Sequence, residues 1–556
     1  MINEKYQPGM IIESSYEVCN KVGGIYTVLS TRAKTMRDRF GSHVMFIGPD
    51  FWQGKDNPLF KESKVLLAKW RKYARENDNL SVRVGKWLIP GEPTAVLVDF
   101  SQFFAEKDAI YTWAWDNFRV DSLHAYGDYD EASMFSYAAG RVVESFYRFS
   151  GFTKDDNVIY QAHEWMTCLG ALYVQKAVPE VATIFTTHAT SIGRSIAGNN
   201  KPLYDYLQYY NGDQMAQELN MQSKHSIEKQ TAFYADCFTT VSDITASECK
   251  ALMDKMPDVV LTNGFEDSFV PAQGKEFDDA RKKARKTMLR VANALLGTKY
   301  TDKTVLISTG GRYEFKNKGI DLLVDSLNRL RGDSSLKEDI IVFINVPAWT
   351  KGPRADLQQR LEGKTLPSVA CSNPRITHDL HNQEQDMILN QMNWLDMQNR
   401  VDDRVKVIFV PCYLDGNDGI FNLHYYDLLI GTDLNIFPSY YEPWGYTPLE
   451  SVAFHVPCIT TDLAGFGLWA NSLKGEYSEL VDGVKTVHRT DSNFVEVAEN
   501  IKDSILYYTM QDGKARRKMR ENAAHLAEKA LWKYFFDNYC QAYDVAIEHR
   551  NDRMKK

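Results

Sequence analysis

Two glutamates, Glu442 and Glu450, lie eight positions apart in the stretch NIFPSYYEPWGYTPLE (435–450). The apolar residues that open this stretch predict a short buried strand, and the proline-rich residues after it predict a loop. Thr447 followed by Pro448 is typical of a helix start, and Glu450 completes a Ser/Thr-x-x-Glu capping pattern. We therefore expect Glu442 on the loop and Glu450 in the first helical turn, at the edge where open α/β sheets bind ligands. The alternative is that Glu450 only caps the helix and Glu442 is a solvated loop residue.

Two cations follow another apolar run, in ISTGGRYEFKNKGIDLLVDSL (307–327). Arg312 and Lys318 lie between a predicted strand and a predicted helix, close to a glycine pair. An arginine fork and a lysine point charge at the end of a strand suit a diphosphate. The alternative is a pair of solvated surface cations.

A second glycine turn near the N-terminus holds Lys21, Gly23 and Gly24 between an apolar strand and an amphipathic helix. Glycines at such a turn let backbone N–H groups approach an anion at the start of a helix. The turn is neither a Walker loop nor a complete G-x-G-x-x-G, so a tight turn without a ligand stays open. His188 and Arg194 follow a further strand, where a lone histidine is more often structural than catalytic.

Strand and helix signals alternate along the chain. Short β-branched runs separated by helix-length segments predict parallel sheets with helices on both faces. They form two series that separate near 265–300, so the sequence predicts an α/β fold of two doubly wound domains facing a cleft. We place the domains at 1–270 and 271–510, with C-terminal helices at 511–556. The predicted strands are 43–48, 94–100, 157–162, 182–187, 237–242 and 258–263, then 304–309, 339–346, 405–410, 434–437 and 457–461.

A polar segment, 351–400, interrupts the second series and predicts a helical insertion. Within it, 384–400 places Ile388, Met392 and Leu395 on one helical face. This stripe must be buried, either against its own domain or in an oligomerisation hairpin.

Composition narrows the class of protein. The 556 residues carry a net charge of −8, which argues against broad binding to nucleic acid or to an anionic membrane. The eight cysteines contain no C-x-x-C pair, and the chain has no signal peptide or long apolar run, so we expect a cytoplasmic protein. Asp128 and Asp130 precede a predicted helix (131–148), and HEWMT is not H-E-x-x-H. We therefore expect no catalytic metal and no cofactor.

Several blocks together resemble the eukaryotic-type glycogen synthases, the glycogen [starch] synthase family. They occur in the family's order and cover most of residues 10–500. The blocks are YEVCNKVGGIYTVLSTRAK, HEWM, TTHAT, CFTTVSDITA, PDVVLTNG, GRYEFKNKG, FPSYYEPWGYTPLE and LAGFG. The resemblance implies two Rossmann-like domains of the GT-B glycosyltransferase type around a deep cleft, with the C-terminal helices crossing back onto the first domain.

The resemblance also implies roles for the matching residues. Arg312 and Lys318 would hold the diphosphate, Glu442 would lie beside the donor sugar, and His188 would contact the transferred glucose. These four form the implied catalytic set. The implied nucleotide-sugar contacts are Lys21, Gly23, Gly24, Arg194, Tyr446, Thr447 and Glu450, where Glu450 accepts from the ribose hydroxyls, and His163 either touches ligand or shapes the cleft.

The implied reaction is retaining transfer of glucose to the non-reducing end of an α-1,4-glucan such as glycogen. UDP-glucose is the expected donor, although no residue excludes ADP-glucose. No nucleophile stands out, in keeping with the front-face mechanism proposed for such enzymes. The resemblance further implies a homo-oligomer, with a tetramer as one form. The competing classes are a phosphorylase, a nucleotide-sugar epimerase and a non-catalytic glycogen-binding scaffold.

The ends of the chain depart from the animal and fungal pattern. The long phosphorylatable tails are missing, so we expect a short bacterial member. Arg516, Arg517 and Arg520 resemble a sparse version of the arginine helix that senses glucose 6-phosphate. An ordinary solvated helix face is the favoured alternative.

Overall fold

The computed structural model describes residues 5–53, 55–363 and 368–555. Contacts divide the chain into two compact units, which we call unit 1 (Met1–Glu266 with Leu531–Lys556) and unit 2 (Asp267–Ala530). The predicted C-terminal region 511–556 is therefore divided. Its first helix, α18 (Gly513–Lys529), packs on elements of unit 2, while α19 (Trp532–Arg553) packs on the sheet of unit 1.

Unit 1 is built on a nine-stranded sheet among the described residues, in the order β3-β4-β5-β2-β1-β6-β7-β8-β9. All neighbours pair in parallel except β3–β4 and β4–β5. The strands are β1 Met10–Ser14, β2 Val44–Pro49, β3 Phe60–Glu62, β4 Ser81–Trp87, β5 Thr94–Asp99, β6 Val158–His163, β7 Ala182–Thr187, β8 Cys237–Thr240 and β9 Val259–Val260. The central parallel strands are buried along their whole length, as expected for a sheet covered on both faces.

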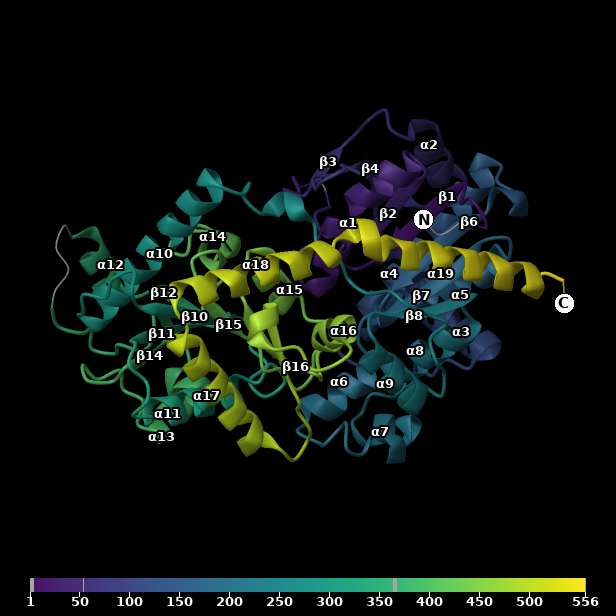
Figure 1. Cartoon of the computed structure of the whole chain (residues 1–556). Helices are drawn as coiled ribbons and strands as arrows, with labels where there is room; N and C mark the ends of the chain where they lie inside the picture. Colours follow the sequence, from purple (N-terminus) through teal and green to yellow (C-terminus); the bar gives the residue numbers. More distant parts are fainter. Residues whose placement is uncertain (1–4, 54, 364–367, 556) are drawn as a thin grey trace. The chain divides into compact units, whose positions relative to one another are not determined.

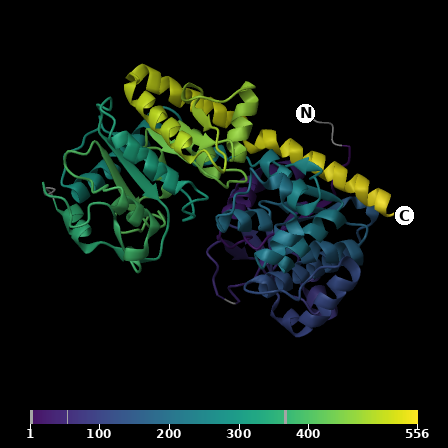
Figure 2. The same ribbon diagram turned by 90° about the horizontal axis from the view of Figure 1, so that it is seen from below.

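The helices of unit 1 cover this sheet. Figures 1 and 2 show α19 as a long helix lying along unit 1, where it contacts β7 and β8. The other helices are α1 Gly24–Phe40, α2 Ala68–Asn77, α3 Lys107–Phe118, α4 Tyr129–Ser150, α5 Cys168–Ala177, α6 Ser191–Gly198, α7 Gly212–Glu218, α8 Gln222–Tyr234 and α9 Asp243–Met253. Since α4 begins at Tyr129, Asp128 and Asp130 lie at a helix start, as predicted, where they pair with Lys224 and Lys107.

Unit 2 holds a six-stranded sheet in the order β14-β11-β10-β15-β16-β17, and every neighbouring pair is parallel. Its strands are β10 Val305–Gly310, β11 Ile340–Asn345, β14 Val405–Val410, β15 Leu434–Ile436, β16 Cys458–Thr461 and β17 Val484–Val487. Its helices are α10 Lys275–Leu296, α11 Ile320–Arg331, α12 Ala355–Glu362, α13 Met387–Trp394, α14 Tyr425–Leu429, α15 Tyr446–Ala453, α16 Gly465–Lys474, α17 Phe494–Met510 and α18. Two parallel α/β sheets therefore form the cores, as the sequence predicted.

The insertion at 351–400 is not simply helical. It contains most of a two-stranded antiparallel sheet, β12 (Thr350–Pro353) with β13 (His378–Leu380), and two short helices. The predicted helix over 384–400 is reduced to α13, which Asp386 caps by accepting from the backbone N–H of Leu389. Ile388 and Met392 are buried in the core of unit 2, so the apolar stripe packs against its own unit. An oligomerisation hairpin is not needed to bury it.

Within the described ranges, we find no helix long and apolar enough to cross a membrane.

Candidate functional site

In unit 2, two loops leave neighbouring strands at the point where the strand order reverses. β10 pairs with β11 on one side and with β15 on the other, which makes the gap between β10 and β15 the topological switch point, the usual ligand position in such sheets. The loop after β10 carries Lys318, and the loop after β15 carries Glu442. These two side chains form an ion pair. The backbone N–H groups of Tyr440 and Tyr441 both donate to the carbonyl of Asn317, at 2.8 and 3.0 Å, so the loops are joined directly.

A glycine makes this junction possible. Gly319 has φ +66°, and a Cβ placed on it would lie 1.9 Å from the carbonyl oxygen of Pro438. Any other residue would therefore push the two loops apart. Gly319 also precedes α11, so it fixes where Lys318 leaves the chain.

Arg312 differs from Lys318 in its surroundings. Its side chain is exposed, and within the described residues it has no ion pair or side-chain hydrogen bond. Lys318 is only about 20% exposed and is held by Glu442. The switch point therefore offers one fixed cation and one unengaged cation.

The capping prediction for Glu450 is wrong. The helix α15 begins at Tyr446 because Gly445, with φ +105°, takes the N-cap position without a side-chain cap. Thr447 thus lies inside the first turn, and Glu450 lies one turn further along. Glu450 is buried and accepts a hydrogen bond from the Tyr426 hydroxyl at 2.8 Å. Glu450 is thus a buried, hydrogen-bonded carboxylate that does not cap the helix.

In unit 1, the structure brings together two histidines from neighbouring strand ends. His163 ends β6 and His188 follows β7, and the His163 Nδ1 and His188 Nε2 atoms lie 3.1 Å apart. On its other side, His163 Nε2 lies 2.9 Å from the Glu13 carboxylate on β1. Burial lowers the pKa of both imidazoles, so both rings are neutral near pH 7.

Glu164 fixes the backbone of His188. This residue was not singled out from the sequence. Its carboxylate accepts from the N–H groups of His188 and Ala189, at 3.0 and 3.1 Å. Glu164 adopts φ +69°, an unusual conformation for a residue other than glycine. Burial and the neighbouring carboxylate of Glu228 raise the pKa of Glu164 to about 8, although the charge of Arg194 opposes this shift. Arg194, on α6, therefore lies in the same group as the histidines.

The glycine turn at the start of α1 already binds a carboxylate. The N–H groups of Gly23 and Tyr26 donate to one oxygen of Glu17, at 2.6 and 2.9 Å. Lys21 is exposed, and its Nζ lies 5.8 Å from the centre of the Tyr26 ring. An added Cβ on Gly24 would meet nothing within 4 Å, so this side of the turn is open. The turn thus has the geometry of an anion site, with Glu17 as its internal anion.

The three arginines of α18 divide into two groups. Arg516 forms an ion pair with Glu338 and also donates to backbone carbonyls. Arg517 and Arg520 instead line a pocket of about 440 Å³ within unit 2. The remaining lining residues are Gln273, Gly274, Phe277, Asp278, His455 and Glu521.

Arg520 gives this pocket its character. Its Nε atom is buried and finds no hydrogen-bond partner within the described residues, and burial lowers the pKa of its guanidinium. Burial, together with the charge of Arg520, lowers the pKa of His455 to about 4. Asp433 and Asp278 partly offset the charge of Arg520, but the unbonded Nε leaves a donor in the pocket that an anionic ligand could accept from.

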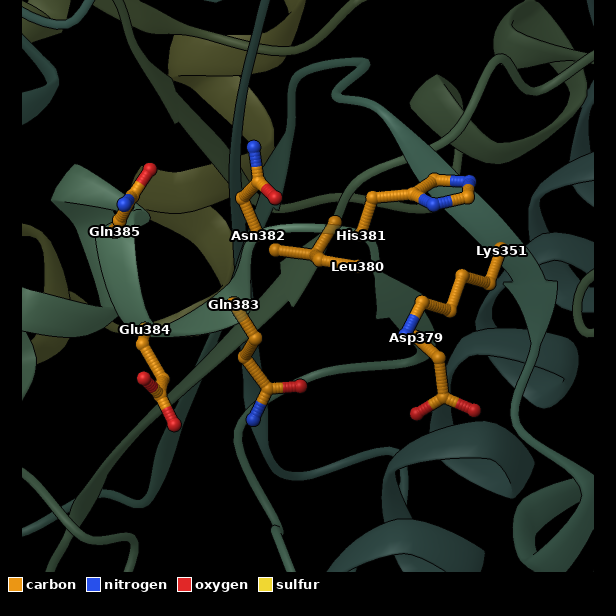
Figure 3. A pocket seen from close by; sticks show the side chains of 8 residues that line it. All are labelled: Lys351, Asp379, Leu380, His381, Asn382, Gln383, Glu384 and Gln385. Carbon is orange, nitrogen blue, oxygen red and sulfur yellow. The ribbon is translucent and has the colours of Figure 1, made fainter.

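Unit 2 also contains a further pocket and a cluster of potential metal ligands away from the predicted site residues. A pocket of about 450 Å³ beside β13 contains none of the predicted site residues; Figure 3 shows Lys351 and Asp379 on one side of it and Glu384 and Gln385 on the other. His378, Cys412 and Asp418 bring three potential metal ligands within 4.8 Å of one another. Both ring nitrogens of His378 are already hydrogen-bonded, to Thr377 and to the carbonyl of Asp418, so this cluster is a structural contact.

Comparisons with solved structures agree with the fold. The catalytic domain of starch synthase IV from Arabidopsis thaliana bound to ADP and acarbose aligns with a TM-score of 0.56 at 15% identity, over 98% of this chain and all of that one. A trehalose 6-phosphate synthase from Burkholderia multivorans aligns with a TM-score of 0.53 at 11% identity, covering 99% of both chains. At such low identity these matches establish the GT-B fold alone, and they confirm the predicted fold class.

Sequence comparisons are more specific. Glycogen [starch] synthase of Neurospora crassa is 28% identical over 97% of this chain and 83% of its own length. The human liver glycogen [starch] synthase is 29% identical over 97% of this chain and 83% of its own length. A family model described as glycogen synthase matches residues 13–357 and 360–554, almost the whole sequence. The chain belongs to the glycogen synthase family.

Proposed function

We propose that this protein is a retaining glucosyltransferase that moves glucose from a nucleotide-diphosphate glucose to the non-reducing end of an α-1,4-glucan. The observation that carries the proposal is the grouping of Arg312, Lys318 and Glu442 on two joined loops at the switch point of the unit 2 sheet. UDP-glucose is the expected donor by resemblance to the eukaryotic-type enzymes.

The cations suit the leaving group. Transfer breaks the bond between C1 of glucose and the diphosphate oxygen, so the departing nucleoside diphosphate gains negative charge. Lys318, which Glu442 holds in place, supplies fixed positive charge at that oxygen, and Arg312 closes on the diphosphate as a fork. The arrangement needs no metal ion to neutralise this charge.

The acceptor reaction needs no protein nucleophile. The 4-hydroxyl oxygen of the glucan forms the new bond to C1 on the face that the diphosphate leaves, and its proton passes to the departing phosphate oxygen. The α configuration is therefore retained. Glu442 lies on the sugar side, where its carboxylate stabilises the positive charge that develops on the ring.

Two further residues are assigned to the rest of the donor. Glu450, oriented by the Tyr426 hydroxyl, accepts from the ribose hydroxyls. His188, held through its ring by His163 and through its backbone by Glu164, contacts the glucose hydroxyls.

We also assign an anionic effector to the pocket of Arg517 and Arg520, with a sugar phosphate as its chemical class. The buried Nε of Arg520, which has no hydrogen-bond partner among the residues the structure describes, supports this assignment. Arg516 is left out, since its guanidinium is engaged by Glu338. If the pocket is regulatory, glucose 6-phosphate raises the rate in the native chain, and Arg520→Ala abolishes the increase while preserving the basal rate. Equal activation of both proteins would remove the pocket from regulation.

The test of the function is release of UDP or ADP from the matching glucose donor, with and without glycogen, in metal-free buffer. Glycogen-dependent release with one donor supports the transferase and identifies the donor. Release that is independent of glycogen, or no release even with glucose 6-phosphate, contradicts the proposal.

A further inference from the structure

A buried ion pair lies directly behind the two histidines of unit 1. Glu13 on β1 and Arg32 on α1 pair with each other, and the side chains of both are fully buried. The C-terminal helix α19 covers the pair, with the ring of Tyr539 centred 4.1 Å from the Arg32 guanidinium carbon. Glu13 also contacts His163, which contacts His188. The result is a continuous polar chain from the core of unit 1 to a predicted glucose-binding residue.

The charge of Glu13 is well defined. Although burial raises the pKa of a carboxyl group, the Arg32 charge and the His163 hydrogen bond together hold the pKa of Glu13 below its usual value. Glu13 is therefore an ionised carboxylate near pH 7, and it can only accept hydrogen bonds.

The hydrogen positions then follow in order along the chain. Because Glu13 only accepts, His163 must carry its proton on Nε2, and a neutral His163 has a lone pair on Nδ1. His188 must therefore donate from Nε2 to that lone pair. This leaves His188 with an unprotonated Nδ1, for which no partner lies among the described residues.

We propose that Glu13 is a positioning residue that acts through His163 to present His188 Nδ1 as a neutral hydrogen-bond acceptor for a glucose hydroxyl. The assignment rests on the proposed glucosyl transfer for its consequence, but the proton arrangement itself can be measured without activity. If His163 carried the opposite tautomer, its Nδ1–H would donate to His188 Nε2. His188 would then carry its proton on Nδ1 and donate to the sugar instead of accepting from it.

The energetics of the ion pair favour a functional reason for its position. Glu13 Oε1 and Arg32 Nε and Nη1 are buried without hydrogen-bond partners within the described residues. A buried ion pair that is incompletely hydrogen-bonded is often less stable than apolar residues of similar volume. Packing alone therefore does not explain why a glutamate stands in the apolar strand MIIES.

Asparagine and leucine at position 163 separate positioning from packing. The amide oxygen of asparagine can occupy the place of Nδ1 and accept from His188, whereas leucine fills the space without any acceptor. We expect His163→Asn to keep kcat within about tenfold of the native chain. His163→Leu should lose roughly 10- to 100-fold in kcat with little change in donor KM, since one buried donor of His188 loses its partner.

A matched control is Ser14→Ala, next to Glu13 on the same strand. It deletes the buried Ser14–Tyr160 hydrogen bond of 2.7 Å and leaves the polar chain intact. We expect it to lower Tm without lowering kcat. If His163→Leu and His163→Asn have equal kcat, the positioning role is wrong, and an equal loss in Ser14→Ala would attribute the effect to packing.

The direct readout is the ring ¹⁵N spectrum of the ligand-free chain labelled at histidine, with His163→Asn and His188→Asn used to assign the signals. We expect the Nε2–H tautomer at both positions at pH 7.5. The Nδ1–H tautomer or an imidazolium at either position overturns the proposal. If the tautomers are as expected but neither donor turns over, the proposed function fails and the proton arrangement stands.

Discussion

The two units hold their candidate residues in opposite ways. In unit 1, His188 is the outer end of a chain of contacts that runs through His163 to the buried Glu13 and Arg32. In unit 2, Lys318 has one side-chain partner, and Arg312 is exposed without one among the described residues. The unit 1 residues are thus preorganised by the core, whereas in unit 2 Glu442 holds Lys318 and, among the described residues, the charge of Arg312 stays unpaired. The difference fits the two tasks that we propose: a neutral glucose needs oriented hydrogen bonds, and a charged leaving group needs cations.

The largest expected effect is at Arg312. We expect Arg312→Ala to lower kcat by roughly 100- to 1,000-fold, as when one charge-stabilising donor is removed from a reacting group. Tm should not change, because in the described part of the chain the Arg312 side chain has no ion pair or hydrogen bond to lose. The matched control is Lys316→Ala, an exposed cation on the same loop that should leave kcat unchanged. Equal losses in kcat in both variants would mean that Arg312 contributes only general positive charge, without a specific contact to the diphosphate.

The next expected effect is a dependence of stability on pH, caused by the buried Glu164 of unit 1. The pKa of Glu164 is raised to about 8, so the native state keeps a proton that the unfolded state loses above its ordinary pKa near 4.5. This group therefore lowers stability as pH rises from about 4.5 to 8, with a slope of at most ~1.4 kcal/mol per pH unit.

Glu164→Gln removes this titration and keeps an oxygen that can accept from His188 and Ala189. We expect the free energy of unfolding of the variant, measured by denaturant titration, to rise relative to that of the native chain as pH increases from 5 to 8.5. A constant difference would show that Glu164 is ionised throughout this range.

The smallest effect concerns the internal anion of unit 1. Glu17 accepts from the N–H groups of Gly23 and Tyr26, where the resemblance places the donor diphosphate. Glu17→Gln keeps an acceptor and removes the charge that repels phosphate, so donor KM should fall about two- to fivefold with kcat unchanged. Steady-state kinetics over donor concentration gives this value. A rise in KM would mean that Glu17 holds the turn in its binding shape.

Much of the fold could be predicted because buried parallel strands are short apolar runs. The long helix over 275–296 and strands such as β7 lie where the sequence places them. The antiparallel strands β3 and β4, at one edge of the unit 1 sheet, were not predicted, since FKE and SVRVGKW mix charged with apolar residues. The insertion was predicted to be helical because its sequence is polar, and its two-stranded sheet joins strands that are far apart in the sequence.

The candidate site was predictable only in part. Motif blocks located the residues at strand ends, such as Lys318 and Glu442, because strand-end position is a local property. They could not show that Glu450 is held by Tyr426, or that Glu17 binds the glycine turn, since these contacts depend on tertiary packing. The one signal for Glu13 was a charged residue inside an apolar strand.

The most direct test of the account follows the transferred carbon. The chain is incubated with UDP-glucose carrying ¹³C at C1 of glucose, with glycogen, in metal-free buffer, and the product is examined by ¹³C NMR; ADP-glucose is run in parallel. We expect a new α-1,4 C1 signal in the polymer that appears in step with nucleoside diphosphate and is lost in Arg312→Ala but not in Lys316→Ala. Label in free glucose, in a β linkage, or unchanged in both donors would contradict it.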